Sequence, residues 1–357
     1  MFVHVETRNG RAKFQYTIST PYSTSADAID PNLPTVLWFH PFAFPYVFHP
    51  QFSDPLLRQF NLVAFSFRAH GETEGDILPE CYGVPEATED ALAFMDAVNL
   101  PECHFVAMDY GSSIALRIAM SHPNRVISLF IISQTCIEEP RETLEGHQQL
   151  YDTWVASLPS PTEVDEERAM EAGFGFAQLM FSNKMSSLGR TMFNIVHPMA
   201  QKNWGYYGLQ NFRIAYIESL RNRRSPSIKA LSRIRCPVKL VYGTDDIAYP
   251  RSYTEDFLRL LKKAGVDASL LIVRGAPHFV SVDFADRLNP IIHAFIKKND
   301  SRRVPPVFDE FFSPWESIYR AVRWGPEGSD RDDDSDDDSD IMITYPPGLY
   351  PSTMTSM

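Results

Sequence analysis

The residues that decide the fold are 107–112 (AMDYGS), which stand between a short apolar run and a helical pattern. A residue on a sharp turn between a strand and a helix projects its side chain above the sheet. Asp109 holds that place, where the N–H groups and the dipole of the helix N-terminus favour negative charge. Ala107 and Gly111, two residues away on each side, are small enough for the two backbones to pack closely. The stretch therefore predicts a carboxylate at the apex of a strand–turn–helix unit.

Short apolar runs on both sides of this turn predict the strands of one sheet. They occupy residues 35–39, 61–67, 104–108, 126–133, 237–242 and 268–273. Runs of this length without polar alternation are typical of strands buried on both faces of a parallel sheet. Helical patterns lie between them, at residues 85–98, 111–121, 251–264 and 289–298, and a hairpin around Asn9-Gly10 precedes them. This order predicts an α/β fold with a doubly wound, mostly parallel sheet.

The alternation of strands and helices stops in the middle of the chain, which predicts an insertion. Residues 137–228 have helical patterns and no clear buried strand, so we expect a helical cap there. The α/β core then comprises residues 1–136 and 229–300. Residues 301–325 contain prolines and aromatic residues and are predicted to form a C-terminal extension. Residues 326–357 begin with a Gly/Ser/Asp-rich run and are predicted to be a disordered acidic tail.

Composition and charge argue against several classes of protein. The formal net charge is −12, and nine acidic residues with one arginine between Glu327 and Asp340 account for −8 of it. A nucleic-acid partner is not expected, because it requires a basic face. The four cysteines form no CxxC pair, so we expect free buried thiols and no zinc site. Apolar segments of signal-peptide or membrane-span length are absent from the sequence, which predicts a soluble cytoplasmic protein that acts on a small molecule.

The turn at Asp109 resembles the nucleophile elbow of the α/β-hydrolase fold family, which reads Gly-x-Ser-x-Gly. Ala107 stands for the first glycine and Asp109 for the serine, and the chain contains no intact Gly-x-Ser-x-Gly. Aspartate followed by an aromatic residue and glycine is similar to the epoxide hydrolase and haloalkane dehalogenase branch, which usually reads His-Asp-Trp-Gly. The resemblance covers approximately residues 30–300. It implies a covalent ester on Asp109 and requires no cofactor and no metal.

A second stretch, residues 38–42 (WFHPF), resembles the His-Gly-x loop that builds the oxyanion hole in this family. Pro41 stands for the glycine and lacks an N–H group, but the donor expected from this loop is the next residue. The resemblance therefore implies an oxyanion hole made by the backbone N–H groups of Phe42 and Tyr110. His40 is a candidate contact for the substrate.

The family order of nucleophile, acid and histidine implies the other two residues. After the run at 237–242 come residues 243–246 (GTDD), whose pattern selects Asp246 as the acid and leaves Asp245 as an alternative. After the run at 268–273 come residues 275–280 (GAPHFV), which resemble the loop that carries the catalytic histidine, His278. Asp109, Asp246 and His278 each follow a predicted strand, at the edge where open α/β sheets place their sites.

The sequence of the predicted cap does not select one substrate class. Epoxide hydrolases use two cap tyrosines as acids, but Phe212 stands where the similar segment, 208–213 (GLQNFR), normally has tyrosine. Candidate substrate contacts in the cap are Tyr206, Tyr207, Tyr216 and Trp204. Tyr110 replaces the tryptophan that holds halide in dehalogenases, so a small apolar epoxide ranks ahead of an alkyl halide. An esterase-like reaction, or a catalytically degenerate binding protein in which Asp109 only caps a helix, are the alternatives.

Overall fold

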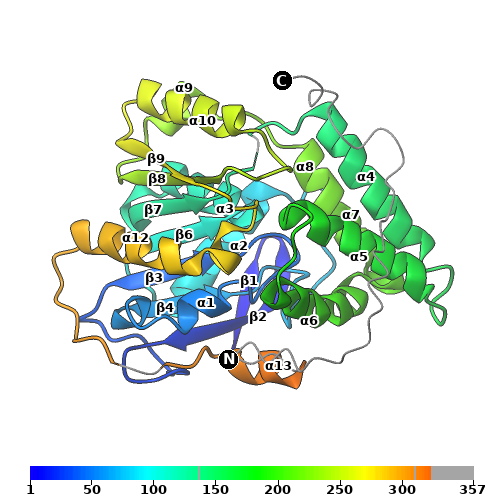
Figure 1. The fold of residues 1–357 in the computed structure, drawn as a ribbon, viewed down its shortest axis with the longest axis horizontal. Helices are drawn as coiled ribbons and strands as arrows, with labels where there is room; N and C mark the ends of the chain where they lie inside the picture. Colours follow the sequence, from blue (N-terminus) through cyan, green and yellow to red (C-terminus); the bar gives the residue numbers. More distant parts are fainter. Residues whose placement is uncertain (136, 309–310, 323–357) are drawn as a thin grey trace.

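The computed structural model describes residues 1–135, 137–308 and 311–322, and Figure 1 shows their arrangement. The predicted acidic tail, the last residues of the predicted extension and Cys136 lie outside this range. A twisted sheet occupies the centre, with helices on both faces, and a group of helices lies to one side of it (Figure 1).

The described part of the chain contains one sheet of nine strands in the order β1-β2-β4-β3-β6-β7-β8-β9, with β5 paired to β2. β1 and β2 form an antiparallel hairpin, and β2 pairs antiparallel with β4; the pairs from β4 through β3 to β9 are all parallel. The strands are β1 Phe2–Thr7, β2 Gly10–Ser19, β3 Thr35–Phe39, β4 Asn61–Phe65, β5 Glu74–Gly75, β6 Cys103–Met108, β7 Val126–Ile132, β8 Val238–Gly243 and β9 Ala268–Val273. The predicted mostly parallel, doubly wound sheet is confirmed.

Helices bury both faces of the sheet, which explains why its central strands are apolar throughout. Every residue of β3, β4 and β6 is buried. Two apolar clusters lie on opposite faces. One contains residues of α2 Val84–Ala97, α3 Tyr110–Ser121 and α10 Arg251–Lys263. The other contains residues of α1 His49–Phe52, α11 Val280–Asp283 and α12 Ala285–Lys298.

The segment between β7 and β8 is helical and lies beside the sheet (Figure 1). It comprises α4 Arg141–Ala156, α5 Glu166–Met180, α6 Ser187–Trp204, a 3-10 turn Tyr206–Gly208, α7 Leu209–Arg213, a π-helical turn Ile214–Glu218, α8 Ser219–Arg221 and α9 Ile228–Leu231. Two further 3-10 turns, Leu57–Gln59 and Pro123–Arg125, lie in the core. Hydrogen bonds join these helices to loops of the core: Phe279 N–H donates to the Met180 carbonyl (2.9 Å) and Leu78 N–H to the Asn211 side chain (2.9 Å).

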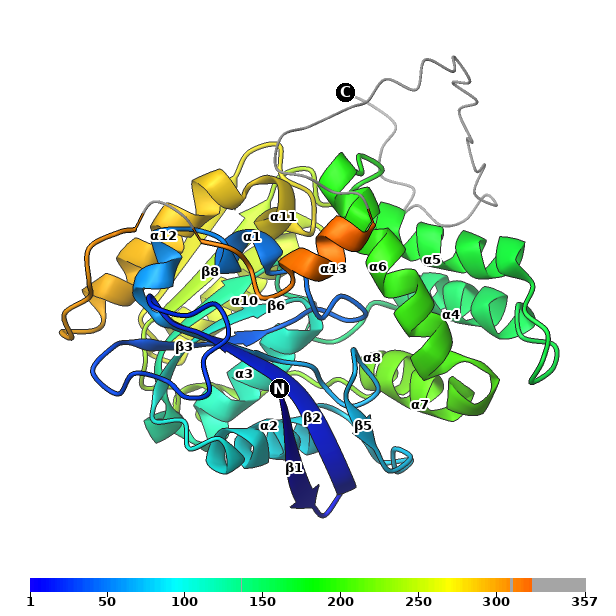
Figure 2. The same cartoon turned by 90° about the horizontal axis from the view of Figure 1, so that it is seen from below.

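The described part of the C-terminal extension packs against the core. Helix α13 Glu316–Ala321 lies beside α6 in Figure 2. Trp315 and Tyr319 are buried in the apolar cluster that also contains α1, and the Tyr319 hydroxyl donates to the Tyr46 carbonyl at 3.0 Å. The extension therefore contacts both the loop after β3 and a helix of the predicted cap.

Two predictions about local structure are wrong. Helix α12 begins at Ala285 instead of residue 289, because Pro290 lies inside the helix instead of starting it. Cys81 is exposed, whereas Cys103 and Cys236 are buried free thiols as expected.

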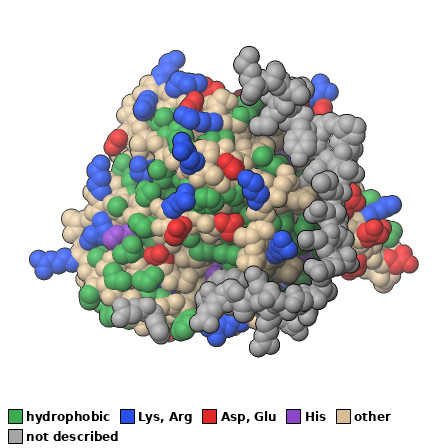
Figure 3. All heavy atoms as spheres, viewed as in Figure 1, with side chains coloured by type: hydrophobic (Ala, Val, Ile, Leu, Met, Phe, Trp, Pro, Cys, Tyr) green, Lys and Arg blue, Asp and Glu red, His purple; other side chains and the backbone are tan. Residues whose placement is uncertain are grey.

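The helices and the surface bear on whether the protein contacts a membrane or a nucleic acid. Among the described residues, no helix has both the length and the apolar character needed to cross a bilayer. On the face shown in Figure 3, basic, acidic and apolar side chains are interspersed. The expectation that the protein has no nucleic-acid partner stays a prediction.

Replacing Gly111 by alanine tests the packing of α3 against the loop after β3. A Cβ at this position would lie 2.5 Å from the Phe39 carbonyl oxygen and 2.6 Å from that of His40. Overpacking of this kind destabilises by about 1–3 kcal/mol, so urea unfolding should give a clearly lower free energy for Gly111→Ala. Gly83→Ala is the control, because its Cβ would meet nothing closer than 3.8 Å. Equal losses in the two variants would contradict the close approach.

Candidate active site

Asp109 occupies the turn between β6 and α3 in a strained backbone conformation. Its φ is +48°, in the left-handed region that non-glycine residues rarely adopt, and such strain costs on the order of 1–3 kcal/mol. The residue is 6% exposed, and its N–H donates to the Ile132 carbonyl at 3.2 Å. The turn thus projects a buried carboxylate above the carboxyl edge of the sheet.

Two backbone N–H groups donate hydrogen bonds to the Asp109 carboxylate. The Phe42 N–H, from the loop after β3, donates to Asp109 Oδ2 at 3.1 Å. The Tyr110 N–H, at the start of α3, also hydrogen bonds to the Asp109 side chain. The structure therefore brings together the two donors that the sequence selected, and Pro41 leaves this arrangement intact because its missing N–H is not used.

His278 lies between two carboxylates. Its Nδ1 is 2.7 Å from Asp246 Oδ2, and its Nε2 is 3.5 Å from Asp109 Oδ1. Asp246 is held in place because its Oδ1 accepts the N–H groups of Ala248 (2.8 Å) and Tyr249 (3.1 Å). Asp245 points elsewhere, since its Oδ2 lies 3.2 Å from Lys184 Nζ. Of the two candidate acids, Asp246 is the one that contacts the histidine.

In the interior, Asp109 and Asp246 stabilise the charged form of His278, and His278 stabilises the charged form of Asp109. Burial lowers the pKa of His278, but Asp246 and Asp109 outweigh this effect and raise it from 6.5 to about 10. Burial likewise raises the pKa of Asp109, but His278 and the Tyr110 and Phe42 N–H groups outweigh it and hold the pKa below its ordinary value. The resting site therefore contains an ionised Asp109 beside a protonated His278.

Comparison with known proteins shows the family of the chain. Residues 36–285 match the profile of the alpha/beta hydrolase fold family. The chain belongs to this family. It is thereby placed among hydrolytic enzymes, and the predicted family resemblance is confirmed.

Individual relatives are distant. This α/β hydrolase is 20% identical over 266 residues to "Epoxide hydrolase 3" of Siraitia grosvenorii. The matched region covers 67% of this chain and 84% of that protein. The chain is 26% identical over 250 residues to "Putative carbamate hydrolase RutD" of Agrobacterium fabrum, with coverage of 69% and 87%. A hydrolase from Pseudomonas aeruginosa PA01 has a similar solved structure, with a TM-score of 0.62, 18% identity and coverage of 83% and 98%.

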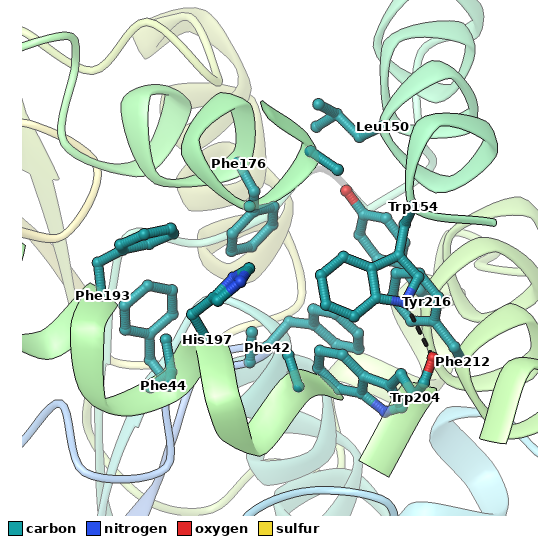
Figure 4. Close-up of a pocket in the computed structure, with 15 residues that line it drawn as sticks. Phe42, Phe44, Leu150, Trp154, Phe176, Phe193, His197, Trp204, Phe212 and Tyr216 are labelled. Atoms are coloured by element: carbon teal, nitrogen blue, oxygen red, sulfur yellow. Dashed lines mark hydrogen bonds between the residues drawn. The ribbon is translucent and has the colours of Figure 1, made fainter. Parts of the chain in front are cut away.

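An apolar cavity lies between the loop after β3 and the helices between β7 and β8 (Figure 4). Its wall includes a set of stacked rings: Phe42 lies 4.9 Å from Trp204 and 4.7 Å from Tyr216, measured between ring centroids. Phe212 stacks on the same group, 4.9 Å from Trp204 and 5.3 Å from Tyr216. The Phe42 ring forms part of this wall while its N–H contacts Asp109, so the cavity and the carboxylate are adjacent.

Three of the proposed substrate contacts lie away from the cavity. Tyr206 and Tyr207 are 42% and 84% exposed, on a 3-10 turn at the surface. His40 is buried, but both its ring nitrogens are used within the core: Nδ1 is 2.6 Å from the Pro41 carbonyl, and Nε2 accepts the Phe67 N–H at 3.1 Å. These three expectations are therefore corrected, whereas Tyr216 and Trp204 do line the cavity.

Sequence reasoning missed a buried ion pair beside the site. Arg223 and Glu139, on the two chain segments that connect the helical group to the core, lie 2.6 Å apart with side chains 8% and 1% exposed. The Tyr249 hydroxyl donates to Glu139 at 2.9 Å, and its ring lies 5.4 Å from that of His278. No local pattern could have indicated this pair, because its partners are 84 residues apart.

Thermal unfolding at different pH values tests the charge of His278. Its pKa is about 10 in the folded protein and near 6.5 when unfolded, so it stabilises the fold fully below about pH 6.5. That contribution disappears as the pH rises through about 10. The melting temperature should fall more steeply between pH 7 and 10 for the wild type than for His278→Gln. Parallel pH profiles would contradict the raised pKa.

Removing one partner of the buried ion pair tests its role in joining the two parts of the chain. Arg223→Met leaves Glu139 buried and uncompensated, which typically costs about 3–5 kcal/mol. Urea unfolding should show this loss, and adding Glu139→Gln should recover part of it. Arg8→Met, whose side chain is 64% exposed beside Glu89, is the matched control and should change stability by about 1 kcal/mol or less.

Proposed function

We propose that this α/β hydrolase opens a small apolar electrophile, above all an epoxide, through an ester on Asp109 that His278-activated water hydrolyses. The observation that carries the proposal is the carboxylate at the nucleophile position. Its two oxygens have different environments: Oδ2 accepts the Phe42 N–H, and Oδ1 lies 3.5 Å from His278 Nε2. An ionised carboxylate needs no base for its own attack.

The first step forms a bond between Asp109 Oδ1 and a substrate carbon. Oδ2 then becomes the carbonyl oxygen of the ester and keeps its hydrogen bond from Phe42. When water attacks this carbonyl, negative charge develops on Oδ2, which already accepts the Phe42 N–H, and the Tyr110 N–H also hydrogen bonds to this side chain. The same two donors thus stabilise the tetrahedral intermediate.

Ester formation also prepares His278 for the second step. Asp109 is one of the groups that raise the pKa of His278, and esterification removes its negative charge. The pKa of His278 then falls, so the ring releases its proton, and the neutral imidazole can accept a proton from water. Asp246, 2.7 Å from Nδ1, continues to orient the ring, so that Nε2 faces the ester.

The case for an epoxide substrate rests on Tyr216. The Trp154 indole N–H donates to the Trp204 carbonyl at 2.9 Å and is not available to a halide (Figure 4). The Trp204 indole N–H, in contrast, has no partner among the described residues, so the donors alone do not exclude an alkyl halide. Tyr216 offers a buried hydroxyl in the cavity wall. An opening epoxide releases an oxygen that such a hydroxyl can protonate. The relative named as an epoxide hydrolase is consistent with this choice.

Trapping the ester tests the proposal. His278→Gln removes the base for the second step, so the ester should persist when the variant is incubated with a panel of epoxides and alkyl halides. Intact-protein mass spectrometry should then detect an adduct of the mass of the whole epoxide, and peptide mapping should place it on Asp109. An adduct that has lost halide would identify alkyl halides as the substrates instead.

The double variant Asp109→Asn/His278→Gln is the matched control and should form no adduct. A wild-type protein that hydrolyses the panel while no Asp109 ester forms in His278→Gln would contradict the mechanism. A folded variant without adduct, together with a wild type without turnover, would favour the catalytically degenerate binding protein.

A further inference from the structure

A buried tyrosine of the cavity wall, Tyr216, contacts a buried histidine, His147. The Tyr216 oxygen lies 2.6 Å from His147 Nδ1, and the two side chains come from the π-helical turn and from α4. Tyr216 is 4% exposed and His147 is 5% exposed. Tyr216 is the third residue of the π-helical turn Ile214–Glu218, and such turns are frequent at functional sites.

His147 is neutral, so it carries only one ring proton. Burial lowers its pKa to about 4, and the nearby Arg223 charge acts in the same direction, against the opposing effect of Asp109. Its Nε2 is buried and has no hydrogen-bond partner among the described residues. If the ring proton were on Nε2, this N–H would be a buried donor without an acceptor, which is rarer in proteins than a buried acceptor without a donor. The proton belongs on Nδ1, where it donates to the Tyr216 oxygen.

We infer that His147 is a positioning residue that donates its Nδ1–H to Tyr216 and so directs the tyrosine proton toward the oxygen released from the substrate. This inference rests on the proposed function. With its oxygen accepting from His147, Tyr216 has its own hydrogen available for a ligand in the cavity. Tyr216 is the one tyrosine among the described residues that line the cavity. It can donate to a ligand because its oxygen already accepts a hydrogen bond from His147.

The proton balance of ring opening follows from this arrangement. As Asp109 Oδ1 bonds to the epoxide carbon, the carbon–oxygen bond breaks and its electron pair stays on oxygen. That oxygen takes the proton of Tyr216, and the resulting phenolate is stabilised by the Nδ1–H of His147. Once the ester has formed, the protonated His278 gives up its proton to the phenolate, which restores the Tyr216 hydroxyl. The neutral His278 then takes one proton from the attacking water. The alkoxide released when the ester bond breaks takes the other proton of that water, which leaves the diol, the Asp109 carboxylate and a protonated His278.

The tautomer of His147 is directly measurable. Long-range ¹H–¹⁵N correlation spectra of ¹⁵N-histidine-labelled protein distinguish protonated from bare ring nitrogens, and His147→Asn identifies the signal among the ten histidines. We expect a proton on Nδ1 and a bare Nε2 at pH 7. A proton on Nε2 would overturn the inference, because Tyr216 would then donate to the histidine instead of the substrate.

Kinetics of ester formation provide the second test, on the His278→Gln background with an epoxide that gives the adduct. His147→Leu removes the donor and should slow single-turnover ester formation by about 10-fold or more, within the range of general acid effects. His147→Asn, which retains an N–H donor, should recover part of the rate. In a Tyr216→Phe background, His147→Leu should have no further effect, because His147 acts only through Tyr216.

Additive losses from His147→Leu and Tyr216→Phe in folded variants would overturn the inference, since they would indicate a merely structural histidine. Tyr207→Phe, at a tyrosine that is 84% exposed, is the matched control and should leave the rate unchanged. Failure of the proposed function gives a different result: no ester forms on the His278→Gln background at all. The tautomer measurement then decides the inference alone.

Discussion

The structure around the site depends on a buried, ionised carboxylate at a strained turn. Asp109 is 6% exposed, and a charge in that environment is stable only if donors and an opposite charge surround it. The Phe42 N–H comes from the loop after β3, the Tyr110 N–H from α3 and the imidazole of His278 from the loop after β9. The parallel strands bring these loops to one edge of the sheet, and Gly111 allows α3 to approach the β3 loop closely enough.

Phe42 links this electrostatic arrangement to the apolar cavity. Its N–H contacts the carboxylate, while its ring packs in parallel with Trp204 and Tyr216 of the helical group. A displacement of the helical group would therefore disturb the stack that holds the Phe42 loop. The apolar wall also excludes water, which strengthens the hydrogen bonds and charges on the other side of the Phe42 backbone.

Polar contacts join the helical group to the core where the chain passes between them. Glu139 precedes α4, Arg223 follows α8, and Tyr249 of the core donates to Glu139. These groups influence the site electrostatically, because Arg223 lies near enough to lower the pKa of His147 and Glu139 near enough to raise that of Tyr216. The connection between the two parts of the chain and the proton chemistry of the cavity are thus physically coupled.

The sequence alone determined the sheet and the turn at Asp109, because both depend on local patterns: apolar runs of strand length, and small residues on each side of a polar one. The resemblance to the α/β-hydrolase fold family implied Asp246 and His278 as the other two residues and Phe42 and Tyr110 as the backbone donors. Only the tertiary structure decided between Asp245 and Asp246, placed His40 in the core, and left Tyr206 and Tyr207 at the surface. It alone revealed the pairs Glu139–Arg223 and His147–Tyr216, whose partners are 84 and 69 residues apart. Such contacts depend on how helices pack against one another, and side-chain packing between distant segments leaves no periodic signal in the sequence.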